Sequence, residues 1–173
     1  MSAARYACIL FFSAILSASA AEPESSIEAY FSPGISCAVA IVREIGRAQQ
    51  TVHVQAYSFT AQPIARALTD VEKRGVKVIA ILDASNRTKK YSAADFLVHE
   101  GIETYIDSQH AIAHNKIIII DGATVLTGSF NFTKAADQKN AENLLVIHDA
   151  RIATKYEENW QTHLRHSDYY AGR

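Results

Sequence analysis

Residues 114–131 read HNKIIIIDGATVLTGSFN, and this stretch predicts a β-hairpin. Ile117 to Ile120 form a β-branched run of the kind enriched in strands. Asp121-Gly122 follows as a tight-turn signal, and residues 124–127 supply a second strand that returns antiparallel to the first. The fold is therefore expected to be built around a two-stranded unit in the second half of the chain.

The hairpin collects polar side chains at one of its ends. His114 and Lys116 are two residues apart, so a strand turns them to the same face. The returning strand delivers Ser129 and Asn131 near the same end of the sheet. An imidazole, an ammonium, a hydroxyl and a carboxamide together suit an anionic tetrahedral group, and phosphate is the obvious candidate.

Helical and strand patterns alternate on both sides of the hairpin. The sequence predicts strands at 28–31, 51–57, 76–82, 102–106 and 144–147. It predicts helices at 36–48, from a Thr60 cap to Gly75, at 92–100 and at 150–164. Strands that alternate with helices, together with one hairpin, indicate an α/β fold with a layered, mixed β-sheet flanked by helices.

Residues 1–20 have the features of a cleaved signal peptide. Arg5 is a short positive region, residues 7–16 are apolar, and Ala18-Ser19-Ala20 is a small-residue cleavage site. The apolar run is shorter than the ~20 residues of a membrane span. We expect cleavage after Ala20, a single domain over residues 21–173 and a periplasmic or secreted product, with an uncleaved anchor as the alternative.

The charge balance excludes binding to nucleic acid through bulk charge. The chain has 17 Lys and Arg residues against 18 Asp and Glu residues, a formal net charge of −1. Any phosphate-binding surface must therefore be local. Arg87, Lys89 and Lys90 lie in a predicted loop and are candidates for nucleic-acid contacts, although an ordinary solvated loop explains them equally well.

The sequence gives no sign of a metal site or a cofactor. Cys37 is the only cysteine after the leader, and a buried apolar role at the start of a helix is expected for it, with an intermolecular bridge as the alternative. No Cys/His spacing is typical of zinc. The carboxylates that could hold Mg²⁺ are scattered and follow no metal-binding motif: Asp83, Asp107, Asp121 and Asp149.

The spacing His-x-Lys, four residues, Asp, six residues, Gly-Ser-x-Asn resembles the signature of the phospholipase D superfamily at all six positions. Residues 56–68 and 129–147 resemble the small bacterial endonucleases of that superfamily. Those nucleases carry one motif per chain, as this sequence does, whereas the larger phospholipases carry two. The resemblance implies a phospholipase D-like fold and a phosphodiesterase.

The resemblance supports a role for each polar residue of the hairpin. His114 is the candidate nucleophile that forms a phospho-histidine. Lys116 neutralises the phosphate oxygens as charge builds in the transition state. Asn131 offers amide donors, and Ser129 a hydroxyl, to the same oxygens.

Three further residues are expected to support the site. Glu142 falls where the related nucleases have a glutamate that orients the catalytic histidine, although a solvated surface carboxylate is the alternative. Asp121 is an odd number of residues from Lys116, so it points away and is expected to be a structural acceptor at the turn. Gly128 is expected to let the backbone approach closely, with an ordinary turn glycine as the alternative.

The favoured function is an exported, metal-independent and sequence-nonspecific endonuclease on DNA, with RNA as a further substrate left open. The resemblance also implies a homodimer with one composite active site. One alternative is a lipid phosphodiesterase, for which Phe130 and Phe132 are the aromatic candidates for contacting acyl chains. The other is an inactive protein that binds anionic polymers.

Overall fold

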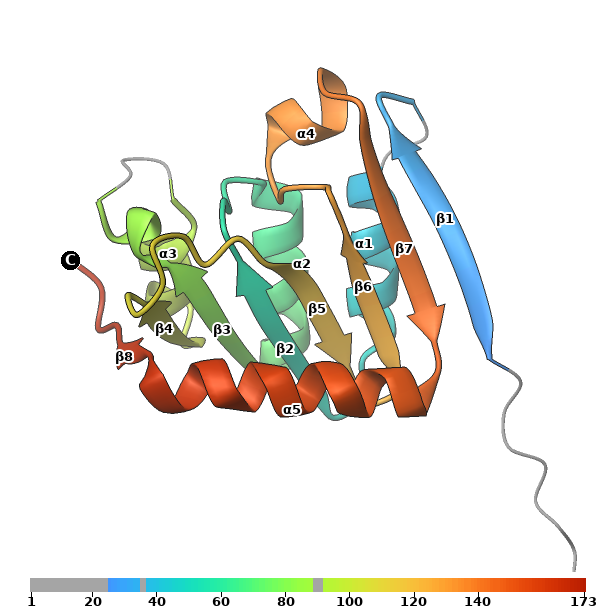
Figure 1. The fold of residues 1–173 in the computed structure, drawn as a ribbon. Coiled ribbons are helices and arrows are strands. Elements are labelled where there is room, and N and C mark those ends of the chain that lie inside the picture. The colour runs from blue at the N-terminus through green and yellow to red at the C-terminus, as the bar shows by residue number, and fades with distance from the viewer. Residues whose placement is uncertain (1–24, 35–36, 89–91) are drawn as a thin grey trace, which may run out of the picture.

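The computed structural model describes residues 25–34, 37–88 and 92–173. In this part of the chain, one eight-stranded sheet has the order β1-β7-β6-β5-β2-β3-β4-β8 (Figure 1). The strands are β1 (Ser26–Ser32), β2 (Thr51–Ala56), β3 (Lys77–Asp83), β4 (Glu103–Asp107), β5 (Lys116–Ile120), β6 (Thr124–Gly128), β7 (Glu142–His148) and β8 (Asp168–Tyr169).

The sheet is mixed, and its pairing decides which strand ends meet. β2, β3 and β4 pair in parallel, whereas the remaining neighbours are antiparallel. The carboxyl ends of β2 and β6 therefore lie beside the amino ends of β5 and β7. We call this the upper edge of the sheet, as it is drawn in Figure 1, and define it by Ala56, Lys116, Gly128 and Glu142.

Helices cover both faces of the sheet (Figure 1). α1 and α2 lie on one face and α5 crosses the other. The helices are α1 (Cys37–Arg47), α2 (Gln62–Lys73), α3 (Ala94–His99), α4 (Lys134–Gln138) and α5 (Ala150–His166), with a short 3₁₀ helix at Ala84–Arg87. The predicted α/β fold with a layered, mixed sheet is confirmed.

Each face of the sheet has its own apolar core, and β5 contributes to both. Ile118 and Ile120 enter the larger core beneath α1 and α2, whereas Ile117 and Ile119 enter the smaller core beneath α5. This burial on two faces explains why the strand is an unbroken isoleucine run and not an alternating one.

The smaller core fixes α5 in place. Trp160 is fully buried, and its indole N–H donates to the Val54 carbonyl oxygen of β2 at 3.0 Å. The His53 ring stacks on Trp160 with centroids 4.1 Å apart, and its Nδ1 lies 2.8 Å from a carboxylate oxygen of Glu157. These contacts hold α5 against the centre of the sheet.

The structure differs from the sequence prediction in local details. Ala61 precedes α2 and Thr60 does not cap it, because Pro63 in the first turn starts the helix without a side-chain cap. α4 and β8 were not predicted, since five and two residues are too short to show a period. A Thr133 hydroxyl that accepts from the Ala136 N–H at 3.1 Å stabilises the start of α4.

The predicted leader lies outside the described residues. None of the described helices is long and apolar enough to cross a membrane. Cys37 is fully buried at the start of α1, and its thiol is free.

Candidate active site

The polar residues of the predicted hairpin meet at the upper edge of the sheet. Lys116 is the first residue of β5, and His114 lies two residues before it. Ser129 follows directly after β6, and Glu142 opens the neighbouring strand β7. Strand pairing alone therefore brings together groups from two separate parts of the sequence.

His114 and Lys116 share contacts with Tyr57, which follows β2. The His114 side chain is exposed, and its ring centroid lies 4.6 Å from that of Tyr57. Lys116 is only 7% exposed, and its Nζ donates to the His114 carbonyl oxygen at 2.7 Å and lies 5.3 Å from the Tyr57 ring centroid. Sequence reasoning missed Tyr57, and its one signal was a position directly after the strand that pairs with β5.

The environment of Lys116 changes its proton affinity. Burial lowers the pKa of Lys116 below the usual lysine range, while the charge of Glu142 acts in the opposite direction. Glu142 is thus close enough to interact electrostatically with the ammonium. A partly desolvated ammonium interacts more strongly with a phosphate oxygen than one surrounded by water.

Glu142 also holds Ser129. The Ser129 hydroxyl donates to one carboxylate oxygen of Glu142 at 2.6 Å, and the Asn140 amide donates to the other at 2.9 Å. The Asn143 N–H donates to the Ser129 hydroxyl at 3.0 Å. No hydrogen bond joins Glu142 to His114 within the described parts of this single chain, so the orienting role that the resemblance implied stays a prediction.

Asn131 follows Ser129 by two residues and adds a partly buried carboxamide to this segment. Its Oδ1 is buried, and it has no hydrogen-bond partner among the residues that the structure describes. The flanking Phe130 and Phe132 are both 1% exposed, and Phe132 packs edge-on against Phe59 with centroids 5.7 Å apart. A buried amide atom without a partner is costly, and a catalytic role is one of the explanations for such an atom.

Gly128 lies at the end of β6, close to the backbone of β7. An added Cβ would lie 2.2 Å from the backbone oxygen of Asn143, at a φ of +157°. The backbone approach expected from the sequence is therefore present, and no other residue fits without separating the two strands.

We expect Gly128→Ala to lower the free energy of unfolding by about 3 kcal/mol through this overlap. Urea or thermal denaturation followed by circular dichroism measures the change. Gly46→Ala is the matched control, because Gly46 lies in α1 with nothing within 4 Å of an added Cβ, and this change should leave stability equal or higher. Equal stability of Gly128→Ala and wild type would contradict the close approach.

Asp121 lies at the opposite edge of the sheet from His114. It occupies the turn with φ 52°, followed by Gly122 with φ 61°. Its carboxylate accepts backbone hydrogen bonds from Gln49, Gln50 and Thr51 at 2.8–2.9 Å. In this arrangement Asp121 is a structural acceptor that lies outside the cluster at the upper edge.

The basic loop is only partly described. Arg87 lies 3.6 Å from a carboxylate oxygen of Asp168, and its guanidinium lies 5.8 Å from the Tyr170 ring centroid. Arg87 is therefore engaged with the C-terminal segment, while Lys89 and Lys90 lie outside the described residues. Their contribution to nucleic-acid binding stays a prediction.

An exposed imidazole, a desolvated ammonium and a serine–glutamate pair at one sheet edge define the class of site: one that attacks and stabilises a phosphoryl group. Residues 41–164 match the family described as "Cardiolipin synthase, PLD-like domain", which covers most of the chain. The protein belongs to the phospholipase D superfamily, and it is accordingly a phosphodiesterase.

Two named relatives are similar to this chain in sequence. The chain is 43% identical over 136 residues to a phospholipase D of Rickettsia felis, which covers 79% of this chain and 68% of the relative. It is 32% identical over 115 residues to a mitochondrial cardiolipin hydrolase of Xenopus tropicalis, which covers 66% of this chain and 55% of the relative.

Two solved structures match the fold along their whole length. Nuc of Salmonella typhimurium, a phospholipase D family member, superposes with a TM-score of 0.82 at 39% identity, covering 85% of this chain and 99% of Nuc. NucT of Helicobacter pylori gives a TM-score of 0.79 at 28% identity, covering 85% of this chain and 100% of NucT.

Proposed function

We propose that this protein is an exported, metal-independent endonuclease that cleaves DNA without sequence preference and forms a phospho-histidine intermediate. The observation that carries the proposal is the match to Nuc, which covers almost all of that chain at 39% identity. The resemblance of residues 56–68 and 129–147 to small bacterial endonucleases supports the same substrate class.

The proposed first step is a displacement at phosphorus. The neutral His114 imidazole attacks phosphorus, the bond to the leaving nucleoside oxygen breaks, and a general acid gives that oxygen a proton. Lys116 stabilises the charge on the non-bridging oxygens, with Asn131 and Ser129 beside it. In the second step water attacks the phospho-histidine, loses its proton to the same acid–base group, and releases His114.

The acid–base group requires a second imidazole, and we propose that a second copy of the chain supplies it. One histidine cannot lie on both sides of phosphorus, and the sequence has one His-x-Lys motif. A two-fold axis places one surface against its own copy, so that His114 faces the partner's His114. The exposure of His114 is compatible with this pairing.

Subunit mixing tests the shared site. When His114→Ala chains exchange with wild-type chains, mixed dimers should be inactive, and activity should fall as the square of the wild-type fraction. Exchange with His99→Ala chains is the control, because His99 is exposed on α3 and its loss should leave activity constant. Two results would contradict the composite site. One is an activity that falls linearly with the wild-type fraction when His114→Ala chains are mixed in. The other is full activity of a protein that sedimentation shows to be a monomer.

A lipid substrate is the second candidate because relatives are named phospholipase D and mitochondrial cardiolipin hydrolase. Phe130 and Phe132, the aromatic residues that could have contacted acyl chains, are buried in the core. Ile112, 55% exposed and two residues before His114, is an apolar side chain that remains available at the surface there.

We expect purified protein to nick plasmid DNA in excess EDTA, because the charge and the proton transfer come from Lys116 and His114. The same preparation is incubated with RNA and with cardiolipin vesicles. Hydrolysis of vesicles with intact plasmid would assign the lipid function instead. Loss of plasmid cleavage in EDTA that Mg²⁺ restores would overturn the metal-independent mechanism.

Export is tested by sequencing the amino terminus of the periplasmic product, which should begin after Ala20.

A further inference from the structure

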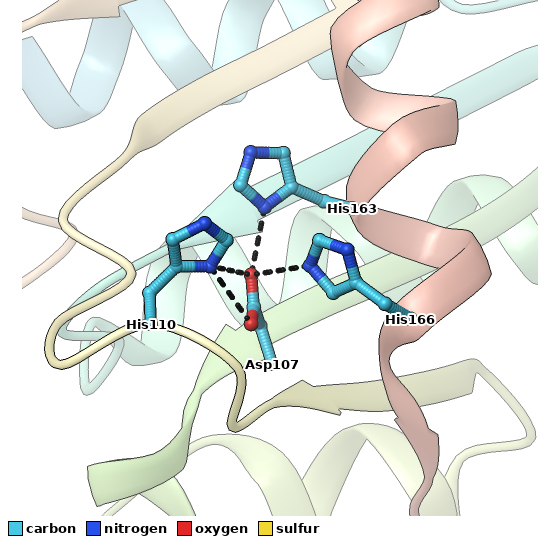
Figure 2. Close-up of side chains that lie close together, drawn as sticks. All are labelled: Asp107, His110, His163 and His166. Atoms are coloured by element: carbon cyan, nitrogen blue, oxygen red, sulfur yellow. Dashed lines mark hydrogen bonds and ion pairs between the residues drawn. The ribbon is translucent and has the colours of Figure 1, made fainter.

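A second cluster of ionisable side chains lies between β4, the loop that follows it and the end of α5 (Figure 2). Asp107 is the last residue of β4, His110 is in the loop, and His163 and His166 are three residues apart near the end of α5. One ligand-type atom from each of the four lies within 4.8 Å of the others. We call these residues the histidine cluster.

The three imidazoles surround one carboxylate. His163 Nδ1 lies 2.7 Å from Asp107 Oδ2, and His166 Nε2 lies 3.3 Å from the same oxygen. His110 Nδ1 lies 3.2 Å from both carboxylate oxygens. The centroids of the three rings are 4.9, 5.2 and 5.3 Å apart, so the rings are spaced almost evenly around Asp107 (Figure 2).

The surroundings of Asp107 favour the ionised form of its carboxyl group. The Asp107 side chain is fully buried, and the Gln109 N–H donates to its Oδ1 at 3.1 Å. Burial alone would raise the pKa of Asp107, but hydrogen bonds from His163, His110 and His166 lower it to about 2. The cluster offers one carboxylate oxygen and three imidazole nitrogens within 4.8 Å of one another, which is a nitrogen and oxygen ligand set typical of zinc.

Hydrogen bonds to Asp107 cannot fully pair the three imidazoles. Asp107 Oδ2 faces all three imidazole nitrogens, whereas a carboxylate oxygen has two lone pairs to offer. A cation at the centre would instead take one lone pair from each of the four groups. With zinc–ligand distances of about 2.0–2.2 Å, tetrahedral ligand atoms are about 3.4 Å apart. The spacings here, from 2.7 Å to at most 4.8 Å, lie on either side of that value, so small side-chain rotations complete the site.

We propose that Asp107, His110, His163 and His166 bind one divalent transition-metal ion, with Zn²⁺ as the best fit, and that the ion fastens the loop after β4 to α5. The sequence had led us to expect no metal site, and the four residues are brought together only by the fold. The cluster takes no part in the proposed reaction, so the inference does not depend on the nuclease assignment.

The ion is expected to stabilise the fold and to leave the position of His114 unchanged. The loop has other attachments next to His114: the Ala113 N–H donates to Asp83 Oδ2 at 2.8 Å, and the Tyr57 N–H donates to the Asn115 carbonyl at 2.8 Å. Turnover in EDTA and zinc-dependent stability are therefore compatible.

The test uses full-length mature protein without an affinity tag, stripped with EDTA and dialysed into metal-free buffer. Isothermal titration with ZnCl₂ should show one equivalent bound per chain. At a zinc concentration 100-fold above Kd, the melting temperature should rise by about 5–10 °C. Co²⁺ should give the intense visible absorption of a tetrahedral site. Absence of stoichiometric binding, or binding without a change in melting temperature, would overturn the proposal.

Matched variants locate the site. His163→Gln and His166→Gln should each lose the zinc-induced rise in melting temperature, while their amides keep a hydrogen-bond donor near Asp107. His99→Gln, on the exposed side of α3, should respond to zinc as the wild type does. If His163→Gln and His166→Gln retained the full zinc response, the ion would bind elsewhere and the assignment would be wrong. The cobalt spectrum of the wild-type protein decides the question even if a variant fails to fold.

Discussion

Replacing His114 with alanine is expected to reduce turnover by about 10⁴-fold or more, because the change removes the atom proposed to bond to phosphorus. The His114 side chain is exposed, and its ring lies tilted against that of Tyr57 with centroids 4.6 Å apart, so the fold should remain intact. Steady-state cleavage of plasmid and thermal denaturation measure the two effects separately.

Two further measurements test whether the loss of activity reflects the loss of the nucleophile. A rapid quench of wild-type protein in detergent at alkaline pH, where a phospho-histidine is stable, should trap label from a radiolabelled substrate on the chain, and His114→Ala should trap none. His99→Ala should behave as the wild type in both assays. Activity of His114→Ala close to that of the wild type on plasmid DNA would show that another group attacks phosphorus.

Lys116→Met is expected to reduce turnover by about 10³-fold, since it removes the positive charge that stabilises the negative charge developing on the phosphoryl oxygens in the transition state. The variant should be at least as stable as the wild type, because burial penalises the charged form of Lys116 and a thioether of similar length carries no such penalty. Loss of activity with retained melting temperature is therefore the expected pair of results. A Lys116→Met protein with normal turnover would remove Lys116 from the mechanism.

The pH dependence of kcat/KM should also report the role of the Lys116 ammonium. Because burial lowers the pKa of Lys116, the ammonium loses its proton at a lower pH than an ordinary lysine does. The alkaline limb of kcat/KM should therefore begin below the range of a solvent-exposed lysine, and activity should fall as pH rises through it. Lys116→Met should lack that limb. An unchanged alkaline limb in the variant would assign the titration to another group.

The isoleucine run and its Asp-Gly turn were sufficient to predict the centre of the fold. The run predicted a strand, and the structure adds that Ile117 and Ile118 enter different cores, so the strand is covered on both faces. The gathering of His114, Lys116 and Ser129 at one edge followed from strand geometry together with the motif. These features were local in sequence, which is why they were predictable.

The parts that could not be predicted depend on contacts between distant segments. Tyr57 reaches the site through the pairing of β2 with β5, and nothing in its own neighbourhood marks it. The histidine cluster joins residues more than 50 positions apart, and its two local spacings, Asp107-x-x-His110 and His163-x-x-His166, match no metal-binding motif by themselves. The two pairs come together only when Trp160 fixes α5 across the sheet.

The turn at Asp121 and Gly122 has a consequence for protein engineering. An exposed turn of this kind is normally a favoured position for a new terminus or an inserted peptide tag. Here the Asp121 carboxylate caps the three N–H groups of Gln49, Gln50 and Thr51, which belong to the segment that enters β2. Cutting or lengthening the chain at this turn would release two regions of the backbone at once. A circular permutant opened there should be among the least soluble of any library, even though the turn itself is on the surface.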